Sequence, residues 1–73
     1  MTVQRLVYMA NQIASFFAGE AKEKAAAATA DHLHKFWDPR MRGTILTQYE
    51  TVKGQMDPLV QRAVEQLRKV AVS

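Results

Sequence analysis

The sequence predicts an all-α fold, a small bundle of three to four helices with Asp-Pro helix junctions. Three observations predict it: apolar residues recur at helical spacing, no segment alternates like a half-buried strand, and an Asp-Pro pair stands at two expected helix starts. A length of 73 residues corresponds to one domain. Residues 1–73 are therefore expected to form a single helical domain.

The first helix is expected from Val3 to Ala18. Its apolar face has i, i+3, i+4, i+7 spacing and consists of Val3, Leu6, Val7, Ala10, Ile13, Ala14 and Phe17. Met9 and Phe16 widen this face to about half of the helix circumference, which favours contact with two neighbouring helices or with a further protein. Gly19 is expected to end the helix.

The second helix is expected from about Ala21 to Phe36, and its start stays open because an alanine-rich stretch favours helix without marking a face. Its inward arc comprises Ala25, Ala26, Thr29, Ala30, Leu33, Phe36 and Trp37. Neighbouring helical residues point about 100° apart, so the two aromatic rings should face different surroundings. We expect Phe36 to pack inward as a structural residue. Trp37 is expected to bind a partner, because tryptophan is frequent among residues that dominate binding energy. The alternative is that both rings pack in the hydrophobic core, where aromatic residues are also frequent.

Asp-Pro pairs are expected to begin the last two helices, because proline disfavours helix in the residue before it and suits the first helical turn. Asp38 caps and Pro39 begins a helix to about Lys53, before Gly54; its apolar residues are Met41, Ile45, Leu46, Tyr49 and Val52. Asp57 caps and Pro58 begins a helix to about Val72; its apolar residues are Leu59, Val60, Ala63, Val64, Leu67, Val70 and Ala71. The two Asp-Pro pairs are thus predicted structural residues.

Three local features add detail. Asp31 with Lys35 and Glu65 with Lys69 have the i, i+4 spacing of helical ion pairs. Gly43, inside the third predicted helix, costs about 1 kcal/mol relative to alanine. We therefore expect it to mark a place where another backbone comes near.

Arg40 and Arg42 fall in the first turn of the third predicted helix. The free N–H groups there are already electropositive, so each cation costs roughly 0.3 to 1 kcal/mol. Together with Trp37, they are predicted to be partner-binding residues. The alternatives are a solvated surface or a local pair with Asp38. Arg42 lies on the apolar side, so its guanidinium must pair with a carboxylate or extend past the rim.

Catalysis is not expected of this chain. It has no cysteine. Its two histidines, His32 and His34, are two residues apart, so on a helix they point away from each other and do not share a metal. No glycine-rich phosphate loop and no acid–base pair of side chains is evident. We therefore expect no catalytic, cofactor-binding or metal-binding residue and no bound cofactor. The N-terminus has neither a signal peptide nor a membrane-spanning run. A cytoplasmic location without membrane contact follows as the expectation.

Two segments, Leu6–Phe17 (LVYMANQIASFF) and Ala30–Arg42 (ADHLHKFWDPRMR), resemble the delta subunit of soluble NAD-dependent formate dehydrogenases. The resemblance implies a non-catalytic accessory subunit that stabilises the large catalytic subunit or assists assembly of the complex. In such complexes the large subunit holds a molybdenum or tungsten pterin and iron-sulfur clusters, and other subunits hold flavin and further clusters. The large subunit and, through it, the remaining subunits are the implied partners.

The net charge of +3 leaves an alternative open, a small basic helical protein that binds nucleic acid. Acidic residues interleave with the basic ones along the chain, which favours a protein partner over nucleic acid. Self-association of the isolated chain also stays open, as does the choice between a permanent subunit and an assembly factor and that between molybdenum and tungsten in the partner.

Overall fold

The computed structural model describes the backbone of residues 2–72 and the side chains of residues 2–70. Within this part of the chain the fold is all-α, as predicted, without a β-strand. Its elements are α1 (Val3–Phe17), α2 (Lys22–Phe36), α3 (Pro39–Thr47), α4 (Tyr49–Val52), the 3-10 helix η1 (Lys53–Gln55) and α5 (Pro58–Val72). None of the described helices combines the length and apolar character that a bilayer crossing requires.

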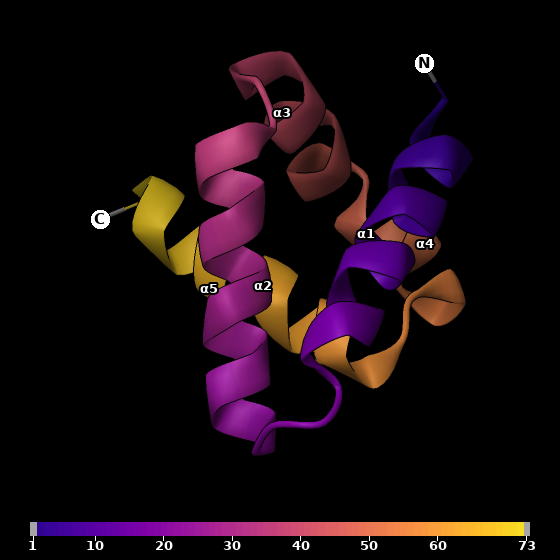
Figure 1. The fold of residues 1–73 in the computed structure, drawn as a ribbon. Coiled ribbons are helices and arrows are strands. Elements are labelled where there is room, and N and C mark those ends of the chain that lie inside the picture. Colours follow the sequence, from indigo (N-terminus) through magenta and orange to yellow (C-terminus); the bar gives the residue numbers. More distant parts are fainter. Residues whose placement is uncertain (1, 73) are drawn as a thin grey trace.

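Helices α1 and α2 form an antiparallel pair at the front of the molecule in Figure 1. α5 crosses behind α2, and α3 lies beside the C-terminal end of α2. The contacts of α2 with α5 and with α1 are the most extensive between elements. Because α2 is the central helix, its C-terminal end is held from several sides, and this is where the predicted site residues lie.

The helix starts follow local capping. The Thr2 hydroxyl oxygen accepts from the Arg5 backbone N–H at 3.2 Å and begins α1. An Asp38 carboxylate oxygen accepts from the Met41 N–H at 2.9 Å, and Pro39 follows in the first turn of α3 as predicted. The open start of the second helix lies at Lys22, after Ala21, which has no capping side chain.

The last helix begins at Pro58, as predicted. Asp57 contributes through its backbone, since its carbonyl accepts from the Gln61 N–H at 3.0 Å. Its own N–H donates to the Asn11 side-chain oxygen at 3.1 Å, and the Asn11 amide donates to the Gln55 carbonyl at 3.2 Å. This asparagine therefore fastens α1 to the turn that precedes α5.

The prediction of one helix from Pro39 to Lys53 is wrong, because the helix breaks at Gln48. Gln48 has φ −100° and ψ 10°, outside regular α-helix, and its carbonyl begins α4 by accepting from the Thr51 and Val52 N–H groups. The segment before the break contains poor helix formers, and the Thr44 hydroxyl bonds back to the Arg40 carbonyl at 2.9 Å, a contact that often bends helices.

The prediction for Gly43 is also wrong. A Cβ atom added there would meet nothing within 4 Å, so no other backbone approaches this glycine. Gly54 lies inside η1 rather than after a long helix, and no described glycine has a positive φ. Neither glycine is therefore required by its backbone conformation or by close packing.

Every predicted helix contributes to one hydrophobic core. Its members are Leu6, Val7, Ala10, Ala14, Leu33, Trp37, Ile45, Tyr49, Val52, Met56, Val60, Val64 and Leu67. Buried Thr29 is satisfied by a hydrogen bond to the Ala25 carbonyl at 2.8 Å. Val70, predicted on the inner face of the last helix, is exposed, and the side chain of Ala71 lies outside the described residues.

Candidate partner-binding surface

The two aromatic residues at the end of α2 occupy the reverse of their predicted positions. Phe36 is 72% exposed, whereas Trp37 is 5% exposed and belongs to the core. The prediction assumed that both residues continue one helix, but α2 ends at Phe36 and Trp37 has an extended backbone, with φ −85° and ψ 139°. Leaving the helix takes the indole into the core, so Trp37 is not an exposed binding residue in this structure.

Arg42 connects the start of α3 to the end of α2. Its Nη1 atom donates to the His34 carbonyl at 3.0 Å and also to the Trp37 carbonyl. The last carbonyls of a helix have no partner within the helix and carry partial negative charge. They offset the unfavourable position of Arg42 at a helix start. The half-buried guanidinium thus bonds to backbone carbonyls. The sequence instead predicts that it pairs with a carboxylate or extends past the rim.

Arg40 has different surroundings from Arg42. It is exposed, and the structure gives its guanidinium no hydrogen bond or ion pair with the described residues. The Asp38 carboxylate, its expected local partner, is bonded instead to the Met41 N–H at 2.9 Å. Of the predicted partner-binding residues, Arg40 is therefore the one that remains available at the surface.

The histidines flank this junction without forming a metal site. The rings of His32 and Phe36 lie 4.6 Å apart between centroids at an angle of 36°, and His34 contributes its carbonyl to Arg42. Within the described part of the chain, no cluster of three His, Asp or Glu side chains could hold a metal ion. The junction at the end of α2 thus presents an aromatic ring, an imidazole and an unpaired cation.

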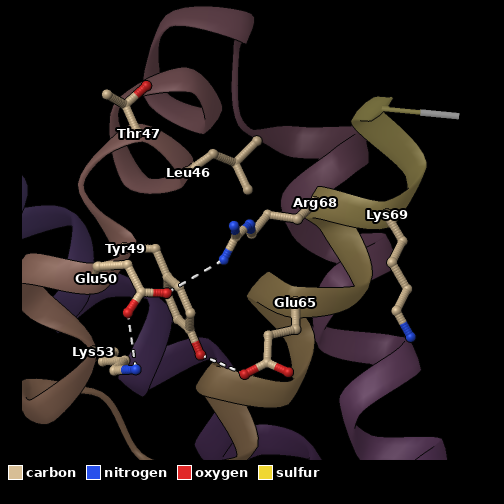
Figure 2. Close-up of a pocket in the computed structure, with 8 residues that line it drawn as sticks. All are labelled: Leu46, Thr47, Tyr49, Glu50, Lys53, Glu65, Arg68 and Lys69. Atoms are coloured by element: carbon tan, nitrogen blue, oxygen red, sulfur yellow. Dashed lines mark hydrogen bonds and ion pairs between the residues drawn. The ribbon is translucent and has the colours of Figure 1, made fainter.

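Sequence reasoning missed a second group of polar residues between α4 and α5. It borders an open depression of about 660 Å³ lined by Leu46, Thr47, Tyr49, Glu50, Lys53, Glu65, Arg68 and Lys69 (Figure 2). The Tyr49 hydroxyl donates to a Glu65 carboxylate oxygen at 2.7 Å. Glu65 therefore bonds to Tyr49 and does not form the predicted pair with Lys69 in the described residues, whereas the predicted Asp31–Lys35 pair is present at 3.1 Å.

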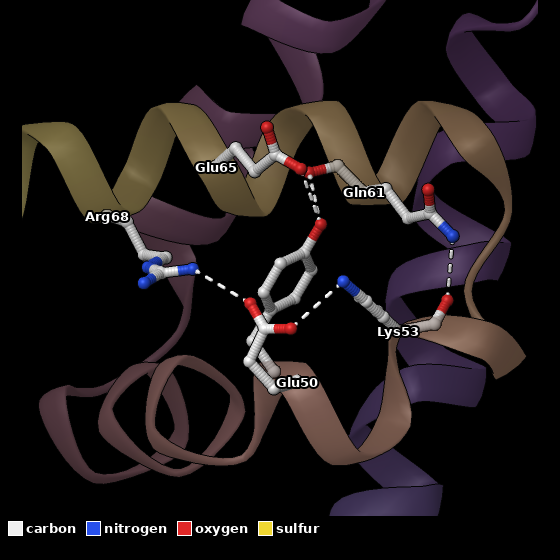
Figure 3. Close-up of polar contacts among 6 residues, drawn as sticks. Glu50, Lys53, Gln61, Glu65 and Arg68 are labelled. Carbon is white, nitrogen blue, oxygen red and sulfur yellow. Dashed lines mark hydrogen bonds and ion pairs between the residues drawn. The ribbon is translucent and has the colours of Figure 1, made fainter.

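Glu50, Lys53 and Arg68, three of the charged residues of this depression, are paired with one another (Figure 3). Glu50 forms ion pairs with Lys53 at 2.9 Å and with Arg68 at 3.6 Å, and the Arg68 guanidinium lies 5.6 Å from the centre of the Tyr49 ring. The hydrogen bond and charge of Lys53 hold the pKa of Glu50 below its usual value. These contacts join α4 to α5.

Burial, followed by the hydrogen bond to Glu65, raises the pKa of Tyr49 to about 12. At neutral pH the phenol is therefore protonated and acts as a hydrogen-bond donor. A general base works best with a pKa near the working pH, which this phenol does not have. Helical spacing could have indicated the Glu50–Lys53 pair, but no sequence pattern indicates which residue of α5 meets Tyr49.

Comparison with known protein families identifies a match over most of the chain. The model of the NADH-dependent formate dehydrogenase delta subunit family, FdsD, matches residues 5–64. The chain belongs to this family. No curated relative and no solved structure matches it significantly.

The family match covers more of the chain than the two segments on which the resemblance to the formate dehydrogenase delta subunit rests. Residues 5–64 include the whole α2–α3 junction, the start of α5 and the part of the Tyr49 depression that lies before Glu65. The exposed Phe36 and Arg40 both lie within the matched region of this delta-subunit family member. These two residues, with Trp37 and Arg42 beneath them, form the candidate site.

Proposed function

We propose that this chain is a non-catalytic accessory subunit of a NAD-dependent formate dehydrogenase, bound to the large catalytic subunit and stabilising it. The observation that carries the proposal is family membership over residues 5–64. Glu50, Lys53 and Arg68 in the Tyr49 depression pair with one another and Glu65 bonds to Tyr49, which is consistent with a structural role for these residues. A cytoplasmic location of the complex is part of the proposal.

The α2–α3 junction supplies the contact in this proposal. Exposed Arg40 has no ion pair with the described residues, so its charge can pair with a carboxylate of the large subunit without breaking any of the contacts described above. Trp37 and Arg42 act indirectly, since the buried indole and the bonded guanidinium hold the shape of the junction. Phe36, four residues before Arg40 in the sequence, adds exposed aromatic surface at the end of α2.

Affinity of the large subunit for charge-reversed variants tests this proposal. Arg40→Glu should weaken binding by about tenfold or more, because it replaces an attraction by a repulsion. Lys22→Glu is the matched control, since Lys22 is also exposed and has no ion pair within the described part of the chain, but lies at the opposite end of α2. Loss of binding in both variants to the same extent would indicate general charge attraction. Unchanged binding of Arg40→Glu would remove the junction from the contact.

An assembly factor is the nearest rival within the same family role. It would be required while the large subunit matures and would be absent from the finished enzyme. A stable subunit remains bound after maturation. The test is to dissociate the chain from active enzyme and remove it. If the chain is a stable subunit, its removal should reduce the stability of the large subunit.

A further inference from the structure

The two most exposed of the large hydrophobic side chains in the described structure are Phe16 on α1, at 84%, and Phe36 on α2, at 72%. Each phenylalanine ends a stripe of residues along one side of its helix. Met9, Ile13 and Phe16 are spaced by four and three residues along α1, and Ala28, His32 and Phe36 by four and four along α2. Met9 and Ile13 are partly buried against the core. The stripe on α1 thus leads from the core to the exposed Phe16, and the stripe on α2 leads from the half-buried Ala28 and His32 to the exposed Phe36.

Both stripes lie on the same side of the antiparallel α1–α2 pair, because the opposite flanks are occupied. The other flank of α1 carries Asn11, which bonds to Gln55 and Asp57. The other flank of α2 borders α5 through Ala27, Ala30, Asp31, His34, Gln66, Leu67 and Val70. α5 passes behind this pair in Figure 1. The two stripes lie on the flanks that the contacts of Asn11 and of α5 leave open. We call this side, formed by Met9, Ile13, Phe16, Ala28, His32 and Phe36, the outer face.

Unpaired cations border the outer face. Arg5 lies four residues before Met9, Lys24 lies four residues before Ala28, and Arg40 lies just beyond Phe36 across the junction. All three are exposed, and the structure pairs none of them with a carboxylate of the described residues. A matching partner surface is therefore apolar at its centre and acidic at its edge.

This distribution of cations makes a second copy of the chain an unfavourable binding partner for the outer face. Two copies related by a twofold axis would apply the same patch to each other and so bring their cations together around one interface. Like charges across an interface weaken association. We infer that the outer face binds an apolar, acid-rimmed surface of the large catalytic subunit, with Phe16 and Phe36 as its anchors. The inference rests on the proposed function and adds α1 to the contact made by the junction.

The test compares the affinities of purified full-length variants for the purified large subunit. The double variant Phe16→Gln, Phe36→Gln removes both anchors and retains good helix formers. It should weaken binding by about thirtyfold or more, as expected for two interface anchors. Tyr8→Gln is the matched control, because Tyr8 is a 58% exposed aromatic residue of α1 about 100° from Met9. It should bind within about threefold of the wild type, and circular dichroism should show both variants equally helical.

A second pair of substitutions, Arg5→Gln with Lys24→Gln, tests the rim. It should weaken binding and reduce the dependence of affinity on salt. If the Phe16→Gln, Phe36→Gln variant binds like the wild type, the outer face is not the contact, although the proposed function stands. If the wild-type chain does not bind the large subunit at all, both fail. A wild-type dimer that this double variant dissociates would identify a second copy as the occupant and overturn the inference.

Discussion

At the scale of single residues, Arg40 and Arg42 have similar sequence positions and different roles. Only Arg42 bonds to the carbonyls that end α2, while the Arg40 guanidinium lies in solvent. Their effects on folding and on binding should therefore separate. The same local sequence thus contains one residue that holds the junction and one that is available to a partner.

Replacing each arginine by methionine tests this difference. Arg42→Met should lower the free energy of unfolding by about 1–2 kcal/mol, because two hydrogen bonds from a charged donor are lost and the carbonyls of α2 keep no partner. Arg40→Met should change it by less than about 0.5 kcal/mol, as is usual for an exposed side chain. Denaturant unfolding measures both values. Equal losses in the two variants would mean that Arg42 does not stabilise the junction.

Tyr49 should stabilise the fold through its hydroxyl. Tyr49→Phe removes the 2.7 Å bond to Glu65 and should lower the free energy of unfolding by about 1–2 kcal/mol at pH 7. The folded pKa of about 12 lies above the ordinary value of 10.0, so the stabilisation is fully present below pH 10 and is lost as the pH rises towards 12.

The pH dependence gives this prediction a specific signature. The difference in free energy of unfolding between wild type and Tyr49→Phe should shrink as the pH rises from 10 to 12. Tyr8→Phe, at an exposed tyrosine, is the control and should change stability by less than about 0.5 kcal/mol. A difference that stays constant over this pH range would contradict the buried position of the Tyr49 phenol.

Residue-level predictions from sequence failed where the chain leaves a helix. The positions of Phe36 and Trp37 were inferred from helical geometry, and that geometry stops at Phe36. The contact of Tyr49 with Glu65 was not predicted because it joins residues 16 positions apart on different helices. Such a contact depends on how the helices pack, which a local pattern does not encode.

At the scale of elements, sequence patterns predicted α1, α2 and α5 within a few residues. The apolar periodicity of α1 and α5 is regular, the alanine-rich segment of α2 favours helix, and Pro58 marks the start of α5 by its fixed φ. The division of the third helix at Gln48 was missed, because the apolar spacing of Ile45, Tyr49 and Val52 continues through the break. All three side chains are buried, so the bend preserves their contacts with the core.

Helix α3 should gain stability from alanine at position 43. Gly43→Ala adds a Cβ into open space and reduces the flexibility of the unfolded chain, so the free energy of unfolding should rise by about 0.5–1 kcal/mol. Ala27→Gly, at an exposed position inside α2, should lower it by a similar amount. Thermal or denaturant unfolding checks both. A loss of stability in Gly43→Ala would show that α3 needs glycine at this position.

At the scale of the whole molecule, the fold explains why the exposed phenylalanines are not part of the core. Residues on the inner faces of the helices from α1 to α5 fill the core, and Phe16 and Phe36 lie outside it as exposed side chains. The wide apolar face of the first helix indicated from sequence that it contacts more than one neighbour. Sequence could not place the stripes of α1 and α2 on a common outer face, because that requires the packing of the two helices.

The central claim is that this delta-subunit family member remains bound to the large catalytic subunit as an accessory subunit. Native mass spectrometry tests it directly, on formate dehydrogenase purified through a tag on the large subunit after co-expression with the untagged chain. The account predicts that active enzyme carries the chain at a fixed ratio to the large subunit. Active, mature enzyme whose mass excludes the chain would contradict it.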